Sequence, residues 1–429
     1  MKRVLIYLAV LPLAVSCGLY GKYSRPEIPD IEITEDIEVP SWRSMFKDPL
    51  LQDLIDTALA RSTDLASAKL NVSAAEIDLK QAKMGFLPSI NASTAPLVEN
   101  PAVNAGVSSW ELDVFGRQTA GVRASKAGLE GETAYSQAVQ AGLVATLADS
   151  YYSLMLLDKE LDISRQTLQS WDKSIQVLES LKLAGKSNDV AVQQARAKRL
   201  GLEASALTIE KNIGVMERSI CTLMGVPFRE VRRGSIDEQE FEPLPQVPVL
   251  YLSGRPDVRR SEMALAKAFY ATNAARASFY PSISLSGVLS WTVDGAVSVT
   301  DPAAWLSVAE PLFMKGSVRA NVKKAKIAQE QALLTFRQTL LDAGNEVADA
   351  LVQCQTAAGK HEIHLQQTEA LQQAVDKIGL RMIYSNANYL EVLTAQQSLL
   401  DAQLLLVQDQ YDRIQGLIKL YRSLGGGVE

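Results

Sequence analysis

The sequence predicts a mainly α-helical fold that is built twice along the chain, with a small β part in each copy. The first observation is an ungapped duplication, in which residues 61–90 align with residues 254–283. The second is a seven-residue spacing of apolar side chains over very long stretches, and the third is a pair of strand-like segments in each copy. Together they predict internally duplicated, long antiparallel helical hairpins and four strands per chain.

The duplication is clearest around two prolines. The segment 86–90 reads FLPSI and aligns with 279–283, which reads FYPSI. Farther along each copy, residues 184–195 resemble residues 384–395. A unit of about two hundred residues is too long for a short solenoid repeat, so the two copies indicate a duplicated half-molecule.

The N-terminus has the pattern of an export signal. Lys2 and Arg3 precede an apolar run over residues 4–15, which is too short to span a membrane as a helix. Cys17 follows small residues at the end of this run, as in a bacterial lipoprotein signal. We therefore expect residues 1–16 to be removed and Cys17 to be acylated. The alternative is a buried cysteine, but a core position next to a removed peptide is hard to place.

The rest of the chain divides into a tether, two structural repeats, a linker between them and a short tail. Including the signal peptide, the predicted bounds in chain order are 1–16, 17–47, 48–227, 228–253, 254–424 and 425–429. The tether is acidic and contains proline, a composition that does not build a core.

Helices are predicted on both sides of the strands. From Asp48 apolar residues recur three and four apart, and a second helix covers about 64–85 before Pro88. In the second copy Pro256 opens the corresponding helix, where the missing N–H of proline has no partner in any case.

Strands are predicted where the helical period is lost, with bounds of about 89–97, 104–115, 282–293 and 303–313. Pro96 and Pro101 predict that the first hairpin is abbreviated or kinked, because proline is normally kept out of interior strands. Three tryptophans suit either an interfacial aromatic girdle or ordinary packing: Trp110, Trp291 and Trp305.

One very long helix and a return helix complete each copy. The seven-residue spacing relates Leu147, Leu154, Leu161, Leu168 and Ile175. Such a seam is typical of helices packed side by side, and the first long helix would extend on the order of 100 Å. Polar breaks at 184–188 and 385–388 turn each long helix back on itself.

Composition and charge exclude several classes of function. The formal net charge is −6, and it becomes −8 when the signal with its two basic residues is removed, so there is no basic footprint for nucleic acid. Cys221 and Cys354 could pair in an oxidising periplasm, but both fall in phase with apolar helix positions and are expected to be core thiols.

Membrane insertion would require several copies of the chain. Beyond Ser16 no apolar stretch is long enough for a transmembrane helix. Strands of about ten residues can each cross a bilayer, but four of them cannot close, since single-chain barrels need at least about eight. If the strands span lipid, several chains must share one barrel.

A set of motifs, in order between residues 42 and 424, carries a family resemblance. They are Trp42-x3-Phe46-Lys47-Asp48-Pro49-Leu50, Phe86-Leu87-Pro88, Trp110-Glu111-Leu112-Asp113-Val114-Phe115-Gly116, Arg255-Pro256-Asp257-x4-Glu262 and Phe279-Tyr280-Pro281. The chain thereby resembles the outer-membrane efflux protein family (outer-membrane factors) of the TolC and OprM type, here as a lipoprotein. The resemblance implies a homotrimer, with a trimeric α-barrel in the periplasm and a shared transmembrane β-barrel.

The resemblance also implies a role for the helical breaks, which would form a periplasmic tip that meets an adaptor protein. The residues expected at that contact are Leu183, Gly185, Lys186, Ser187, Asn188, Tyr384, Ser385 and Asn386. TolC-type relatives carry two acids three apart at a gate, and the matching positions here are Glu391 and Thr394. One acid is lost, and Glu391 can equally be a solvated helix charge. Asp189 is expected to be a helix cap or a solvent-facing acid.

The function that follows is a passive exit duct. It would receive substrates from a periplasmic adaptor (membrane fusion) protein and an inner-membrane pump of the RND type, and release them outside the cell. The alternative is a lipid-anchored periplasmic coiled-coil scaffold without a pore.

Enzymatic activity is not expected, and neither is a cofactor or a metal. His361 and His364 are one residue short of the His-Glu-x-x-His zinc spacing, and a solvated helix pair is favoured over a weak metal site. The match Gly185-Lys186-Ser187 lacks the upstream glycine of a phosphate-binding loop and is expected to be a turn.

Overall fold

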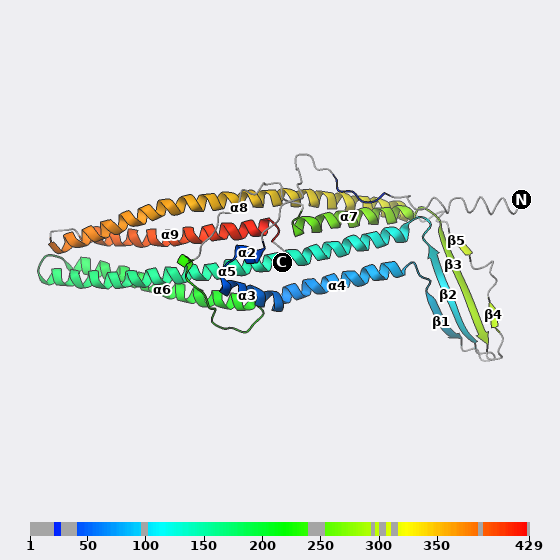
Figure 1. Ribbon diagram of the computed structural model, residues 1–429, viewed down its shortest axis with the longest axis horizontal. Helices are drawn as coiled ribbons and strands as arrows, with labels where there is room; N and C mark the ends of the chain where they lie inside the picture. Colours follow the sequence, from blue (N-terminus) through cyan, green and yellow to red (C-terminus); the bar gives the residue numbers. More distant parts are fainter. Residues whose placement is uncertain are drawn as a thin grey trace. The chain divides into compact units, whose positions relative to one another are not determined.

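The structure is a computed structural model of the 429-residue chain. It describes residues 21–26, 41–95, 102–238, 254–292, 297–299, 306–309, 316–384 and 389–426. Figure 1 shows the helices and strands that they form. These residues belong to two compact units. Unit 1 comprises Met1–Glu32, Ser67–Gln137 and Pro256–Leu341, and unit 2 comprises Ile33–Ala66, Ala138–Arg255 and Asp342–Glu429.

The two copies contain corresponding elements in the same order. The first has α3 (Pro49–Arg61), α4 (Thr63–Met84), β1 (Ile90–Ala95), β2 (Ala102–Leu112), α5 (Arg117–Leu183) and α6 (Asp189–Leu223). The second has α7 (Pro256–Ala277), β3 (Ser282–Thr292), β4 (Val297–Val299), β5 (Leu306–Ala309), α8 (Ser317–Tyr384) and α9 (Tyr389–Ser423). The long helices have 67 and 68 residues, and both return helices have 35. The predicted fold of duplicated long hairpins with a small β part is confirmed.

Two short elements were not anticipated. Helix α2 (Trp42–Met45) lies within the segment predicted as tether, and the 3-10 helix η3 (Ile236–Glu238) lies within the segment predicted as linker. Trp42 and Phe46 are buried in the core of unit 2. Residues 41–47 therefore contribute to the core, whereas a tether would not.

The strands form one antiparallel sheet in unit 1. The order is β1-β2-β3-β4, and β5 pairs with β3 as well. Ile90 faces Val107 in the first hairpin, and Ser282 faces Ala309 in the second. Strand β1 has 6 residues and β2 has 11. Pro96 and Pro101 lie outside the described residues, so the predicted kink of the first hairpin stays a prediction.

The motif around Trp110 forms the joint between β2 and α5. Asp113 accepts from the backbone N–H groups of Gln118 and Thr119, each over 2.8 Å, and so caps the start of α5. Phe115 stacks on Tyr280 with ring centroids 4.8 Å apart. These contacts make the joint a packed and capped corner.

Trp110 itself takes part in packing at this joint. Its indole N–H donates to the carbonyl of Phe86 over 3.0 Å, as expected for a tryptophan with one polar atom to satisfy. The side chain of Trp291 and all of Trp305 lie outside the described residues, so the aromatic girdle stays a prediction.

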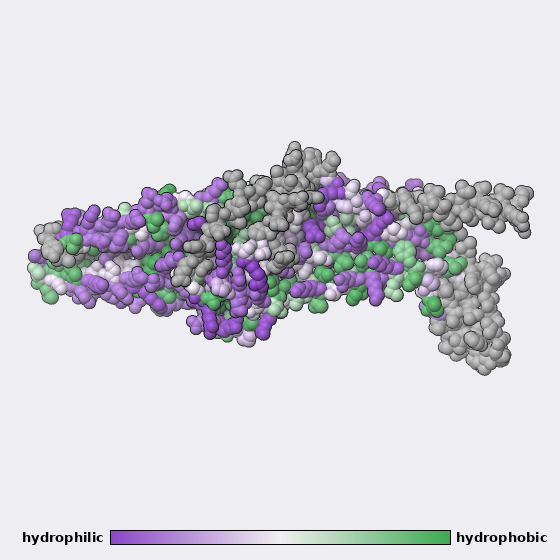
Figure 2. All heavy atoms as spheres, viewed as in Figure 1, coloured by the Kyte–Doolittle hydropathy of each residue, from purple (hydrophilic) through white to green (hydrophobic). Residues whose placement is uncertain are grey.

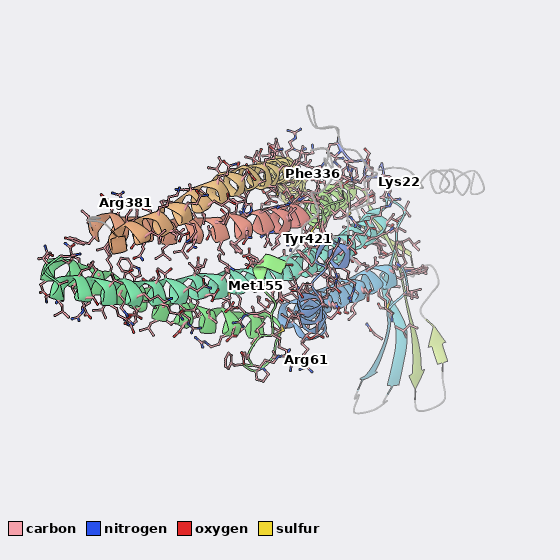
Figure 3. The ribbon with its side chains drawn as sticks, turned by 60° about the vertical axis from the view of Figure 1, so that its left-hand side comes forward. Lys22, Arg61, Met155, Phe336, Arg381 and Tyr421 are labelled. Atoms are coloured by element: carbon pink, nitrogen blue, oxygen red, sulfur yellow. The ribbon has the colours of Figure 1, made fainter. Side chains whose placement is uncertain are left out.

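A large core lies in unit 2, where α2 and α3 pack on α5, α6 and α9. Leu147 and Leu154 of the predicted seam are fully buried there. Met155 on α5 and Tyr421 on α9 belong to the same cluster (Figure 3). Cys221 is buried and Cys354 is partly buried, and both thiols are free, as expected of packed cysteines that do not pair.

None of the described helices has both the length and the hydropathy that crossing a membrane requires.

Candidate functional site

The turn between α5 and α6 is tight and capped. Gly185 has a φ of 72°, the left-handed conformation that favours glycine at the end of a helix. The N–H of Lys186 donates to the carbonyl of Leu181 over 2.8 Å. The side chain of Asn188 accepts from the N–H of Ala191 over 2.9 Å and caps α6. The prediction that the Gly-Lys-Ser match is a turn is confirmed.

Most side chains of this turn face solvent, whereas the hydroxyl of Ser187 is buried. Leu183 is 90% exposed, and Lys186 and Asn188 are exposed as well. The ammonium of Lys182 lies 2.5 Å from a carboxylate oxygen of Asp189 and lowers the pKa of that carboxyl. Asp189 is thus a solvent-facing acid, and its neighbour Asn188 is the cap.

The second turn is described only from Tyr389 onward. Ser385, Asn386 and the side chain of Tyr384 lie outside the described residues. Glu391 and Thr394 are both exposed, and their spacing of three places them on one face of α9. Their part in a gate stays a prediction.

A groove of about 570 Å³ lies between α6 and α9 in unit 2. The hydroxyl of Tyr389 lies 3.5 Å from the amide oxygen of Gln194 on α6. The groove is lined by Gln194, Ala197, Lys198, Leu390, Leu393, Thr394, Gln397 and Ser398. The α6 residues belong to none of the motifs found in the sequence, although exposed Leu390 in the first turn of α9 was an available signal.

The two histidines are not the solvated pair that the sequence favoured. Both are partly buried, and Nδ1 of His364 contacts Oδ2 of buried Asp409 on α9. The ammonium of Lys360 lies 3.0 Å from the other oxygen of Asp409, which raises the pKa of Lys360. His364 therefore joins α8 to α9 through a buried carboxylate. Among the residues that the structure describes, no group of three or more potential ligands could hold a metal ion.

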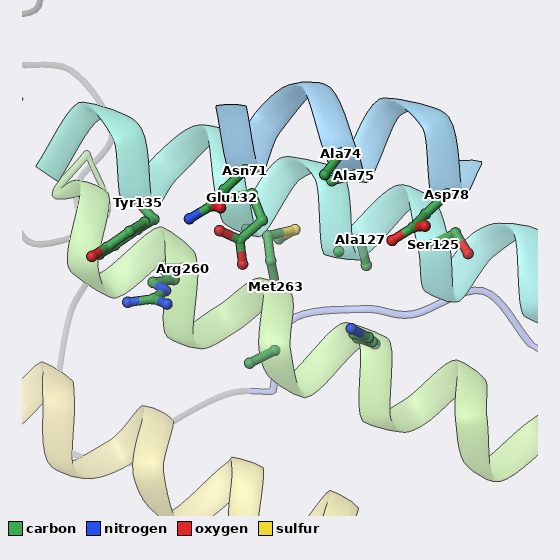
Figure 4. Close-up of a pocket in the computed structure, with 14 residues that line it drawn as sticks. Asn71, Ala74, Ala75, Asp78, Ser125, Ala127, Glu132, Tyr135, Arg260 and Met263 are labelled. Atoms are coloured by element: carbon green, nitrogen blue, oxygen red, sulfur yellow. The ribbon is translucent and has the colours of Figure 1, made fainter. Parts of the chain in front are cut away.

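A cavity of about 650 Å³ lies in unit 1 among α4, α5 and α7 (Figure 4). Asp78 on α4 and Glu132 on α5 line it at different places, and α7 contributes Arg260. The guanidinium of Arg260 lies 3.9 Å from the ring centroid of Tyr135, a cation–π contact. The cavity is open to solvent and is lined by both acidic and basic side chains, so its chemistry does not favour one class of ligand.

Two apolar stripes remain exposed on helices of unit 1. Each repeats every seven residues, and its members are 52% to 70% exposed. The stripe on α4 is Leu70, Ile77 and Met84, and the stripe on α8 is Ile327, Leu334 and Leu341. Figure 2 shows hydrophobic residues at the surface of the helices. Heptad stripes of this kind are typical of helix-to-helix contact surfaces.

Comparison with curated proteins finds relatives that match nearly the full length. The chain is 27% identical over 456 residues to the probable outer membrane lipoprotein SilC of Salmonella typhimurium, covering 99% of this chain and 98% of the relative. It is 27% identical over 455 residues to the cation efflux system protein CusC of Escherichia coli K12, covering 97% and 99%. It is 26% identical over 467 residues to the toluene efflux pump outer membrane protein TtgC of Pseudomonas putida, covering 100% and 96%.

Solved structures of outer-membrane channels are also similar to this chain over nearly its full length. A crystal structure of CusC, whose title refers to transmembrane channel formation, has a TM-score of 0.85 at 26% identity and covers 96% of this chain and 100% of its own. The open state of the MtrE outer membrane channel of Neisseria gonorrhoeae has a TM-score of 0.84 at 25% identity, covering 95% and 98%.

A family model confirms the resemblance carried by the motifs. The model described as outer membrane efflux protein matches residues 54–226 and 247–426, which together are most of the chain and include both copies. The chain belongs to the outer membrane efflux protein family, and its place is the bacterial outer membrane.

Proposed function

We propose that the chain is the outer-membrane exit duct of a tripartite efflux system and that three copies form one channel. The relatives above support the duct, since they are named as efflux proteins and their structures as outer-membrane channels. One observation within the chain supports assembly from several copies. Each open edge of the sheet is close in sequence to a helix with an exposed apolar stripe, α4 before β1 and α8 after β5.

The sheet has two edges among the described strands. Strand β1 pairs only with β2, and β4 and β5 pair only with β3. In hydrocarbon an open edge leaves backbone N–H and C=O groups without hydrogen-bond partners. Each such group costs on the order of several kcal/mol, the free energy of moving an unpaired amide from water to an apolar medium. A sheet that inserts must therefore be closed by another copy.

The apolar stripes mark where the next copy would contact the helices. Helix α4 leads directly into edge strand β1, and α8 follows edge strand β5 in the chain. The first stripe lies on α4 and the second on α8. If α4 and β1 of one copy meet α8 and β5 of the next, the same contact repeats around a ring and closes it.

The stripes give a direct test of this assembly. Leu334→Glu places a charge in the proposed contact, and we expect the trimer to dissociate in mild detergent and conductance in planar bilayers to be lost. Thr335→Glu is the matched control, because Thr335 is exposed on the next position of α8 and outside the stripe. A monodisperse, conducting trimer of Leu334→Glu would overturn the proposed interface, and a stable monomer of the unaltered protein would overturn the shared barrel.

We further propose that the capped turn around Gly185 contacts a periplasmic adaptor, with energy supplied by an inner-membrane pump of the RND type. Fully exposed Leu183 offers an apolar contact at that turn. Photo-cross-linking from position 183 in cells should capture the adaptor. Capture from the matched exposed position Leu200, in the middle of α6, should be weaker.

We also propose that Cys17, which lies outside the described residues, is acylated and that cargo is selected upstream, in the pump. One relative is named a lipoprotein, and relatives of similar identity are named for cations, toluene and antibiotics. Replacement Cys17→Ala should abolish the acyl mass, while the channel remains in the membrane. A protein released by that change would instead be a lipid-anchored scaffold.

A further inference from the structure

Residues 21–26, which follow the proposed acylation site, lie against α7 in unit 1. Both oxygens of Glu262 are engaged by the guanidinium of Arg25, with Nε at 2.9 Å and Nη2 at 2.6 Å. The carboxylate side chain is only 7% exposed, whereas that of Arg25 is 33% exposed. Glu262 is the last residue of the family motif that begins at Arg255, and its partner comes from 237 positions earlier in the chain.

A second contact lies farther along α7. The backbone N–H of Tyr23 donates to the hydroxyl of Tyr270 over 3.2 Å, and its ring meets that of Phe269 edge-on with centroids 5.9 Å apart. Burial of the Tyr23 ring, with Glu262 nearby, raises the pKa of its phenol. This segment is thus docked by a charged pair and by an aromatic pair.

The order of the two contacts sets the direction of the segment. Arg25 pairs with Glu262, and Tyr23, two residues closer to the N-terminus, meets residues seven and eight positions closer to the C-terminus of α7. The segment therefore runs antiparallel to α7, and its N-terminal end points toward the end of α7 that leads into β3. Five residues lie between Cys17 and Tyr23, and the six steps from one Cα to the next can span at most about 20 Å.

We propose that residues 22–25 are a docked strap, which delivers the acyl group of Cys17 to the strand-bearing end of unit 1. Lipid and strands would then enter the membrane from the same surface, and the length of free chain between anchor and channel would be only a few residues. The strap rests on the proposed acylation of Cys17. It also gives the motif residue Glu262 a role, as the anchor point of the strap.

Trypsin tests the strap in the full-length protein in proteoliposomes. Lys22 is exposed and is the first trypsin site after Cys17. Arg25 does not compete with it, because trypsin cleaves poorly between arginine and proline. Cleavage after Lys22 requires the residues on both sides to leave α7, so its rate reports undocking. We expect Arg25→Ala to speed this cleavage about ten- to a hundredfold, the range for loss of a charge-assisted hydrogen-bonded pair. Arg43→Ala, which removes an exposed ion pair with Asp56 in unit 2, should leave it unchanged.

A charge exchange separates the strap from general damage. The double variant Arg25→Glu with Glu262→Arg should return the cleavage rate toward that of the unaltered protein. Tyr23→Ala removes the aromatic contact alone and should also speed cleavage. Unchanged cleavage in Arg25→Ala, or rapid cleavage of the unaltered protein, would overturn the strap.

Spin-label distances test the direction. With Cys221 and Cys354 replaced by alanine, a label at Gly21→Cys should lie closer to a label at Ala271→Cys than to one at Ala264→Cys. Gly21 has open space where a side chain would be added, and both alanines are exposed on α7. The reverse order would overturn the antiparallel course.

The same preparations keep this proposal distinct from the proposed function. The mass of the released peptide 17–22 reports whether Cys17 is acylated, and conductance in planar bilayers reports the channel. A conducting protein with an unprotected strap overturns the strap alone. A protected strap without conductance overturns the channel alone, and a protected strap without acyl mass removes its role in lipid delivery.

Discussion

Helix α5 passes through both units, and its buried face differs between them. In unit 1 its buried positions seven apart are Ala120, Ala127 and Ala134, and in unit 2 this spacing continues through Ala141 and Ala148. Unit 2 also buries the neighbouring position, with Leu147, Leu154 and Leu161. Small residues let helices approach closely, whereas the large ones are covered by further elements, α2 and α3 among them. Unit 2 thus has a large core of its own, although Leu200 and Leu207, seven apart on α6, are exposed there as well. Unit 1 buries mainly small residues along α5 and exposes the stripes on α4 and α8.

The largest effect should come from the core of unit 2. Leu154→Ala removes a fully buried side chain, and we expect a loss of about 2–5 kcal/mol of stability, the usual range for such a cavity. Thermal unfolding followed by circular dichroism measures it. Leu200→Ala, at an exposed position of α6, is the matched control. Equal losses of stability for the two variants would contradict the assignment of Leu154 to the core and of Leu200 to the surface.

The alanine seam of unit 1 should respond to the opposite change. Ala134→Leu forces a large side chain into a close helix contact, and we expect a loss of about 1–3 kcal/mol. The same melting experiment applies. A neutral or stabilising outcome would mean that the alanine positions are loosely packed and that the comparison between the units is wrong.

The joint of β2 and α5 should show a smaller effect. Asp113→Ala removes the acceptor for two N–H groups and should cost about 0.5–2 kcal/mol, the range for helix caps. Asp113→Asn keeps an acceptor and should recover part of the loss. If both variants melt like the unaltered protein, the capped corner contributes nothing to unit 1.

The exposed turn around Gly185 should show the smallest effect. Because Lys182 lowers the pKa of Asp189, the ion pair stabilises the folded state above the ordinary aspartate pKa and is lost as the pH falls through the lowered value. Asp189→Asn should therefore cause a small change that is equal at pH 8 and pH 6 and disappears at strongly acidic pH. Melting at these pH values measures it, and a change that grows on acidification would contradict the ion pair.

Much of the fold could be read from the sequence, because the informative patterns are local and repeated. The duplication, the heptad seam at Leu147 and Leu154, and the polar break at 184–188 each depend on neighbouring residues. Proline and glycine marked the ends of helices for the same reason, as Pro88 and Gly185 illustrate. The four strand segments were found, but the short strand β4 was not, since it lies between the two strands predicted for the second copy.

The contacts that the sequence did not reveal join residues far apart in the chain. Arg25 and Glu262 are 237 positions apart, and His364 and Asp409 are 45 apart on different helices. Neither pair leaves a periodic signal, since a lone charge in a helical pattern reads as solvated surface. Trp42 was noted as a motif residue, but the burial of its side chain, which extends from α2 into the core, depends on the packing of unit 2 as a whole.

The return helices have equal lengths of 35 residues, which limits the insertions and deletions that either helix can accept. An insertion of one helical turn in α6 alone would displace its turn by about 5.4 Å and shift every later contact of that helix against its neighbours. Tolerated length variants of this protein should therefore add or remove residues in both halves together, in register with each other.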